Sequence, residues 1–201
     1  MVAGPHATTD KDSRIPPRSR ILAAAAELFY RHGIRAVGVE AIAETAGTNK
    51  MTLYRHFASK DELVAEYLRQ SANAADACWE RFGQAHPGDP LEQLSAWLEE
   101  MAFHLAEPDE RGCALANAAI ELPEKNHPAR RVIEEYKRAQ RTRLVRLSEE
   151  AGLSDPEMLA DELHLLLEGA RVTAQSVGTE GLAARLLDMG KAMIAAHTPR
   201  R

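Results

Sequence analysis

The stretch Gly33–Leu63, GIRAVGVEAIAETAGTNKMTLYRHFASKDEL, decides the fold, because it contains two short helical patterns separated by one glycine. Apolar residues recur at helical spacing over 39–46, and Gly47 follows where the lack of a Cβ permits a positive φ. Asn49 is a favoured N-cap for a second helix over 50–57. A helix, a glycine turn and a second helix are typical of a helix-turn-helix.

The second helix of this motif has an inner and an outer face. Leu53 and Phe57 form the apolar inner face. The residues left outward are Lys50, Met51, Tyr54 and Arg55. In a helix-turn-helix the start of this helix enters the DNA major groove, where a cation reads guanine acceptors and an apolar group touches the thymine methyl. The pattern therefore indicates a DNA-reading face.

A third helix begins directly after the motif. Ser59-Lys60-Asp61-Glu62 satisfies the S-x-x-E capping box. The amide end of this helix, together with Lys60, can face a phosphate. We therefore expect base reading by the second helix of the motif and phosphate binding at the start of the third.

The same stretch resembles the N-terminal signature of the TetR/AcrR family of bacterial transcriptional regulators. The residues that carry the resemblance are Ile42-Ala43, Ala46-Gly47, Thr52-Leu53-Tyr54, His56-Phe57, Ser59-Lys60 and Leu63, and it covers about Pro17 to Leu63. Val37 and Gly38 depart from it, since they stand where the family usually has a Thr or Ser cap. Glycine is a tolerated N-cap, so we expect a slightly weaker helix start and an intact motif.

The resemblance implies an all-α fold, in which an N-terminal three-helix DNA-binding head with a helix-turn-helix is followed by a C-terminal helical ligand-binding and dimerisation body. The expected domains are a flexible N-terminal arm over 1–16, the head over 17–63 and the body over 64–201. The arm is polar and ends at Pro16-Pro17. It is interpreted either as a tail without a role or as a segment that grips DNA.

The expected partner of the head is double-stranded DNA with a palindromic operator sequence. The candidate DNA-binding residues are Arg18, Thr48, Asn49, Lys50, Met51, Thr52, Tyr54, Arg55, His56 and Lys60.

The charge distribution agrees with a head that binds DNA. The whole chain has a formal net charge of −5, but residues 1–65 carry nine Lys or Arg against seven Asp or Glu. The head is therefore basic and the rest of the chain acidic. Because attraction to phosphates can be local, the negative net charge of the whole chain does not exclude DNA binding by the head. Two cysteines do not make a disulfide framework, and no signal peptide or membrane-spanning apolar run is present, so a cytoplasmic protein is expected, with no membrane partner.

Helical patterns account for the rest of the chain. They cover 17–32, 59–83, 89–108, 113–122, 126–152, 155–176 and 182–194.

Two apolar stripes run along the helix over 155–176. One contains Leu159, Leu163, Leu166, Leu167, Ala170 and Ala174, and the other contains Met158, Leu165, Gly169 and Val172. A helix that is apolar on two faces needs two neighbours, inside a monomer or across an interface. The resemblance implies a homodimer in which the last two helices pair with their copies. The candidate dimerisation residues are Leu163, Leu166, Leu167, Ala170, Leu186, Met189 and Met193, and which stripe faces the partner is left open.

The resemblance also implies a pocket for a small-molecule effector in the body. Large apolar side chains alternate there with polar groups, as in pockets that have a few polar anchors. The candidate ligand-binding residues are Trp79, Phe82, Trp97, Met101, His104, Cys113, Asn117, Glu121, Tyr136, Arg171 and Gln175. In the alternative interpretation the aromatic residues fill the core and the polar residues lie at its rim.

No catalytic, metal or cofactor motif is present in the sequence. The histidines and cysteines lack metal-ligand spacing, and no nucleophile elbow or P-loop occurs. His104 and Cys113 lack a third orienting group, so they are a weak catalytic signal.

We therefore expect a homodimeric regulator, a repressor that a small and largely apolar ligand releases from its operator. Two alternatives stay open: a helical enzyme or ligand carrier with a vestigial head, and an activator or nucleoid-associated protein that uses the same head.

Overall fold

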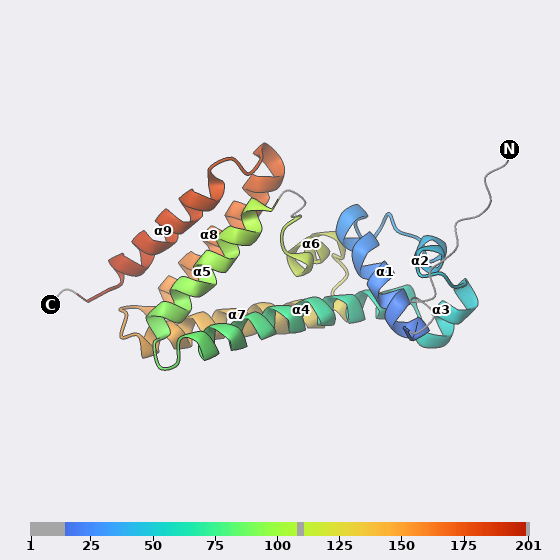
Figure 1. The fold of residues 1–201 in the computed structure, drawn as a ribbon, viewed down its shortest axis with the longest axis horizontal. Helices are drawn as coiled ribbons and strands as arrows, with labels where there is room; N and C mark the ends of the chain where they lie inside the picture. Colours follow the sequence, from blue (N-terminus) through green and yellow to red (C-terminus); the bar gives the residue numbers. More distant parts are fainter. Residues whose placement is uncertain (1–14, 108–110, 200–201) are drawn as a thin grey trace. The chain divides into compact units, whose positions relative to one another are not determined.

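The computed structural model describes residues 15–107 and 111–199, and the regular structure within these ranges is entirely helical (Figure 1). The helices are α1 (Pro17–His32), α2 (Val39–Thr45), α3 (Lys50–His56), α4 (Lys60–Ala85), α5 (Pro90–Ala106), α6 (Ala114–Glu121), α7 (Pro128–Glu150), α8 (Pro156–Val177) and α9 (Leu182–Ala196). The all-α expectation is confirmed. The expected arm lies almost wholly outside the described residues, as does Pro108, the predicted end of α5.

The chain divides into two compact units, residues 1–67 and 68–201, and the division falls inside α4. The predicted division, between residues 63 and 64, lies slightly earlier. The physical reason is that the first turns of α4 belong to the core of the head, where Val64 is buried and the Tyr67 ring lies 5.7 Å from the ring of Phe29. We refer to the two units as the head and the body.

In the body, α5 packs against α7, α8 and α9, and α8 packs against α7 and α9 (Figure 1). Leucines and one tryptophan dominate the core between these helices. Its most deeply buried large side chains include Leu94, Trp97, Leu98, Leu144, Leu147, Leu159, Leu163 and Leu167. Since the apolar faces of four helices meet here, this core is the main source of hydrophobic stabilisation in the body.

The contact between α5 and α9 depends on one glycine. A Cβ added at Gly190 would lie 2.5 Å from a methyl carbon of Leu98, which is itself buried. We expect Gly190→Ala to destabilise the body, because an overpacking cost of about 1–3 kcal/mol exceeds a helix-propensity gain of about 1 kcal/mol. Urea denaturation measures the difference.

Gly83 in α4 provides the matched control for this substitution, since a Cβ there would meet no atom within 4 Å. Gly83→Ala is expected to raise the free energy of unfolding by up to about 1 kcal/mol. Equal stability of the two alanine variants would contradict the close packing of α5 on α9.

Candidate nucleic-acid interface and body cleft

The turn between α2 and α3 has a well-defined geometry. Gly47 has a φ of 60°, the Thr48 amide donates to the Ala43 carbonyl at 2.9 Å, and the Gly47 amide donates to Glu44 at 3.0 Å. These two bonds form a Schellman motif. The Asn49 side chain then accepts a hydrogen bond from the Thr52 amide at 2.9 Å, so α3 begins at the predicted cap.

The two faces of α3 are those predicted from the sequence. Leu53 and Phe57 are buried in the head, whereas the Met51 side chain is 84% exposed and Tyr54 is 42% exposed. Lys50 and Arg55 are exposed as well. The start of α3 therefore presents two cations, an aromatic ring and a thioether on one accessible face.

Lys50 has a partner that the sequence analysis missed. Its ammonium nitrogen lies 2.6 Å from a carboxylate oxygen of Glu40, in the first turn of α2. The hydrogen bond and the charge of Glu40 raise the pKa of Lys50, and the hydrogen bond from Lys50 lowers the pKa of Glu40. Both groups are therefore charged at neutral pH. A spacing of ten residues across a turn is no local sequence signal, so only the turn geometry reveals this pair.

Two further candidate DNA contacts are already used inside the head. The Arg18 guanidinium lies 2.8 Å from Glu66 and 5.0 Å from the centre of the Phe57 ring. The Lys60 ammonium donates to the Ile34 carbonyl at 2.6 Å. Both cations therefore contact other groups of the head, and the Arg18 side chain is still 50% exposed. Their contact with DNA stays a prediction.

His56, Thr48 and Thr52 are half-buried. The Nε2 atom of His56 is inaccessible and has no hydrogen-bond partner in the described part of the chain. Packing in the head therefore accounts for His56 better than a phosphate contact does. Thr48 and Thr52 flank the Asn49 cap and leave part of their side chains accessible.

The start of α4 contains a variant of the predicted capping box. The Ser59 hydroxyl accepts from the Glu62 amide at 3.1 Å, and the Glu62 carboxylate accepts from the Ala58 amide at 2.7 Å. Gly38 is the N-cap of α2 and makes no side-chain hydrogen bond, and the weaker helix start stays a prediction.

The candidate dimerisation residues do not share one environment. Leu163, Leu167, Ala170 and Leu186 belong to the core of the protomer. A side chain that is already covered has no surface for a partner, so their assignment to the interface is wrong. Leu166 and Met193 are half-buried, and Met189 is exposed.

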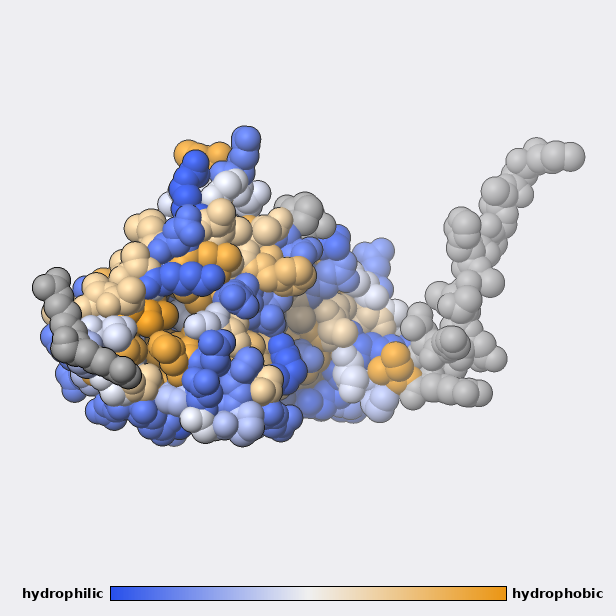
Figure 2. All heavy atoms as spheres, turned by 60° about the vertical axis from the view of Figure 1, so that its left-hand side comes forward, coloured by the Kyte–Doolittle hydropathy of each residue, from blue (hydrophilic) through white to orange (hydrophobic). Residues whose placement is uncertain are grey.

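The opposite stripe of α8 is the accessible one. Leu165 is 71% exposed, Val172 is 61% exposed and Met158 is also exposed. Figure 2 shows hydrophobic patches on the surface, in orange, between hydrophilic residues, in blue. α8 therefore uses one apolar stripe for its own core and leaves the other uncovered.

The aromatic candidates for ligand binding pack against one another. The Trp79 and Trp97 rings are stacked with centroids 5.8 Å apart, and the Phe82 ring meets the Trp79 ring edge-on at 5.7 Å. Trp97 is only 2% exposed. Phe82 and Trp97 are buried in the core and Trp79 packs against it, which favours the alternative interpretation that the aromatic residues fill the core.

Several polar candidates are engaged with the backbone. The amide groups of Asn117 and Gln175 donate to the Arg111 carbonyl at 2.7 and 2.5 Å. These two hydrogen bonds stabilise the turn before α6, in which Gly112 has a φ of 79°. Both side chains thus have a hydrogen-bond partner within the body, and their contact with a ligand stays a prediction.

The other candidates are dispersed in the body. Cys113 is buried and Glu121 is half-buried, whereas His104 is exposed beside Glu100. Met101 packs at the edge of the core.

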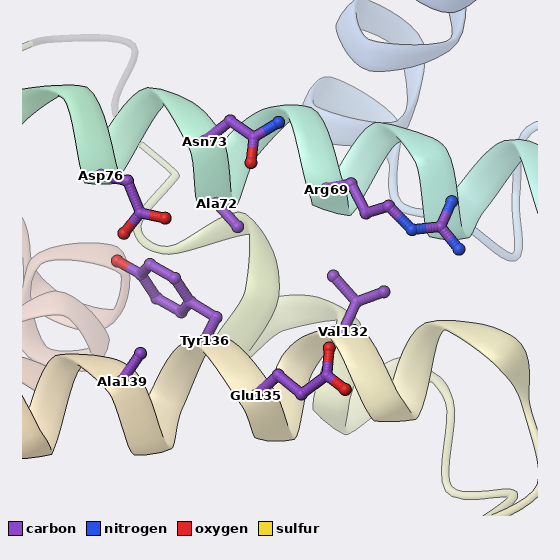
Figure 3. Close-up of a pocket in the computed structure, with 8 residues that line it drawn as sticks. All are labelled: Arg69, Ala72, Asn73, Asp76, Val132, Glu135, Tyr136 and Ala139. Atoms are coloured by element: carbon purple, nitrogen blue, oxygen red, sulfur yellow. The ribbon is translucent and has the colours of Figure 1, made fainter.

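A cleft of about 250 Å³ lies between α4 and α7. Its lining residues are Arg69, Ala72, Asn73, Asp76, Val132, Glu135, Tyr136 and Ala139. Tyr136 alone had been predicted. The lining residues of α4 are spaced three and four positions apart, so they share one face of the helix. Most of them are polar, so in the sequence this face looks like an ordinary solvent-exposed one. Figure 3 shows the Tyr136 hydroxyl and the Asp76 carboxylate on facing helices, directed toward one another.

A network of charges lies around Tyr136. Burial raises the pKa of the Tyr136 phenol far above its usual range, and the nearby Cys113 adds to the effect, so the hydroxyl stays protonated. Burial alone would raise the pKa of Glu168, but Lys137 at 2.8 Å and Arg171 at 3.1 Å lower it overall. The cleft thus contains a neutral phenol, whereas these three charged residues are not among those that line it.

The described residues contain no group of three or more side chains arranged to hold a metal ion. Within the same ranges, no helix has the length and apolar character required to cross a bilayer.

Comparison with known proteins gives consistent results. The family described as bacterial regulatory proteins, tetR family, matches residues 21–67. The structure of a TetR-type regulator, sav143 from Streptomyces avermitilis, is 33% identical with a TM-score of 0.79, and the match covers 92% of this chain and 100% of that one. The structure of SCO4454, a TetR-family transcriptional regulator from Streptomyces coelicolor, is 27% identical with a TM-score of 0.86, covering 91% and 96%.

Curated relatives match over shorter stretches. The HTH-type transcriptional regulator LmrA of Bacillus subtilis is 30% identical over 128 residues, which are 59% of this chain and 63% of LmrA. Repressors and an activator also match over about a quarter of their own lengths.

Proposed function

This chain belongs to the TetR family of bacterial transcriptional regulators, and we propose that it is a homodimeric repressor, released from a palindromic operator by a small effector bound in its body. It is a regulator and not an enzyme. We propose that it acts in the cytoplasm, since that is where the bacterial chromosome lies. The observation that carries the proposal is the face of α3, where Lys50, Met51, Tyr54 and Arg55 are exposed while Leu53 and Phe57 anchor the helix.

The palindromic operator follows from the symmetry of the proposed dimer. Two identical heads related by a two-fold axis read two identical half-sites in consecutive major grooves. The uncovered stripe with Leu165 and Val172 supports an interface on α8, because apolar patches of this kind mark association surfaces. Met189 on α9 is exposed as well and fits the same surface.

We infer that the effector binds in the cleft between α4 and α7 and that it is a hydrogen-bonding molecule instead of a largely apolar one. Four of the lining residues are charged or carry a side-chain amide: Arg69, Asn73, Asp76 and Glu135. The protonated Tyr136 hydroxyl adds a donor and an acceptor (Figure 3). α4 contributes residues both to this cleft and to the head. If the effector binds one position of α4 more tightly than another, and the operator prefers a different position, effector binding lowers the affinity for the operator by linkage.

The decisive experiment is DNase I footprinting of the purified protein on the region upstream of its own gene. We expect a protected palindrome whose half-sites are about one helical turn apart. A reporter fused to that region then gives the sign of regulation, since both repressors and an activator occur among the relatives. Equal affinity for operator and scrambled duplexes would contradict the proposal and favour a nucleoid-associated protein.

Tyr136→Phe tests the effector site. The substitution removes one hydroxyl from the cleft, so we expect effector affinity to fall about 3- to 10-fold, as for one lost hydrogen bond of about 0.5–1.5 kcal/mol. Calorimetric titration with an effector found by thermal-shift screening measures the change. Operator binding without effector is expected to stay within about twofold of the wild type, since the head is untouched.

The matched control is Tyr30→Phe, which removes the same atom from a residue of α1 that does not line the cleft. Unchanged effector binding by Tyr136→Phe, or an equal loss in both variants, would move the effector site elsewhere.

A further inference from the structure

Lys50, the cation at the start of α3, forms an ion pair within the head. Lys50 lies 2.6 Å from Glu40, and the two side chains are 55% and 68% exposed. Arg55, the other cation on the outward face of α3, makes no ion pair with any residue in the described ranges. The two cations of the same face therefore differ, although the sequence presents both as free positive charges.

The Lys50–Glu40 pair is built into the turn. Glu40 stands in the first turn of α2 and Lys50 in the first turn of α3. The Schellman bonds at Gly47 and the Asn49 cap hold the starts of the two helices in a fixed relation. The carboxylate therefore stays near the ammonium without further ordering of the backbone.

A carboxylate at this position acts differently on the two kinds of DNA contact. A phosphate attracts Lys50 mainly by its charge, and Glu40 both offsets the charge of Lys50 and repels the phosphate. A guanine edge instead offers oriented acceptors, and an ammonium group has three donors. Lys50 can keep one hydrogen bond to Glu40 and donate another to a base.

We propose that Glu40 is a specificity-determining residue of the DNA-binding surface, which positions Lys50 for base reading and suppresses its attraction to phosphates. The inference rests on the proposed role of α3 in the major groove. Glu40 raises the ratio of operator affinity to nonspecific affinity, chiefly by lowering the nonspecific affinity.

Glu40→Gln tests this role, with Glu44→Gln as the matched control. Glu44 lies one turn later in α2, is exposed, and has no ion pair with any of the residues described. The two substitutions change the net charge equally. Binding is measured on the operator and on a scrambled duplex of equal length at several salt concentrations, and thermal melting confirms that both variants fold.

For Glu40→Gln we expect the affinity for scrambled DNA to rise by about threefold or more. The salt slope on that DNA should steepen by about one unit, because the released ammonium group neutralises one more phosphate. Operator affinity is expected to change less, so the specificity ratio falls. Glu44→Gln is expected to change both affinities alike. Equal ratios in the two variants, or a ratio unchanged from the wild type, would overturn the proposal.

The double variant Glu40→Gln/Lys50→Ala shows whether Glu40 acts through Lys50. Without the ammonium group, we expect Glu40→Gln to change the specificity ratio no more than Glu44→Gln does. If Glu40→Gln lowers the specificity ratio as much in the Lys50→Ala background as in the wild type, Glu40 acts directly on DNA, and the proposed positioning role is wrong.

The wild type separates a failure of this inference from a failure of the proposed function. A wild-type protein that does not prefer any operator over scrambled DNA contradicts the regulator proposal itself. A wild type that discriminates, with Glu40→Gln discriminating equally well, contradicts only the role of Glu40.

Discussion

Leu163→Arg is expected to abolish folding of the body, whereas Leu165→Arg, two residues away on α8, is expected to leave a folded monomer. Leu163 is 1% exposed and lies in the core, so arginine there buries an unpaired charge and disrupts packing, at a cost of at least about 3–5 kcal/mol. That is a large share of the roughly 5–15 kcal/mol that stabilises a domain. Leu165 is 71% exposed, so a charge there costs little within one protomer.

The monomer formed by Leu165→Arg should bind the operator weakly. It engages one half-site, and without the second half-site the affinity falls by an avidity factor of about 100 or more. Circular dichroism, sedimentation equilibrium and operator titration distinguish the outcomes. Thr142→Arg, at an exposed position of α7, is the control that should stay folded and dimeric. A folded Leu163→Arg protein, or a dimeric Leu165→Arg protein, would refute the assignment of the two stripes.

The head was predictable because its signals are local. Asn49 bonds an amide three residues ahead, and Gly47 needs only its own positive φ. Such interactions depend on residues a few positions apart, so the sequence displays both partners together. Glu40 and Lys50 interact across the turn, and the pair was missed for that reason.

The stripes of α8 show where a sequence pattern becomes ambiguous. Both stripes have helical spacing and apolar composition, and hydrophobicity does not record which one a neighbouring helix covers. In the structure, α5, α7 and α9 cover the stripe that contains Leu163 and Leu167. The resemblance implied an interface but did not indicate its face, and the candidates Leu163, Leu167 and Ala170 lie on the stripe that the protomer covers itself.

The polar candidates in the body show a related ambiguity. Asn117 and Gln175 were expected to meet a ligand, but they bind one backbone carbonyl, that of Arg111. A backbone carbonyl accepts a hydrogen bond from a side-chain amide just as a ligand can, and the sequence does not distinguish these two uses of the amide. Asp76 and Asn73 line the cleft, yet on α4 they look like ordinary solvated positions.

Trp97→Ala is expected to lower the free energy of unfolding of the body by about 3–5 kcal/mol, since truncating a buried aromatic ring leaves a cavity that the packed core fills only in part. Trp97 is 2% exposed and stacks on Trp79 with an interplanar angle of 11°. If its ring lined an open effector pocket, truncation would change effector binding and leave most of the stability intact. In thermal melting, the expected loss corresponds to a midpoint about 10–15 °C lower.

Indole provides the sharper test of this assignment. A cavity lined by apolar residues stays dry and accepts a small apolar molecule of matching shape. Added indole should therefore raise the melting temperature of Trp97→Ala and leave that of the wild type unchanged, because the wild-type core has no room for a second ring. Arg111→Ala, at an exposed position of the turn before α6, is the control that should show no indole response. A wild-type protein that indole stabilises as strongly as the variant would show that the body already holds an open apolar pocket, and the largely apolar effector first expected from the sequence would replace the hydrogen-bonding one.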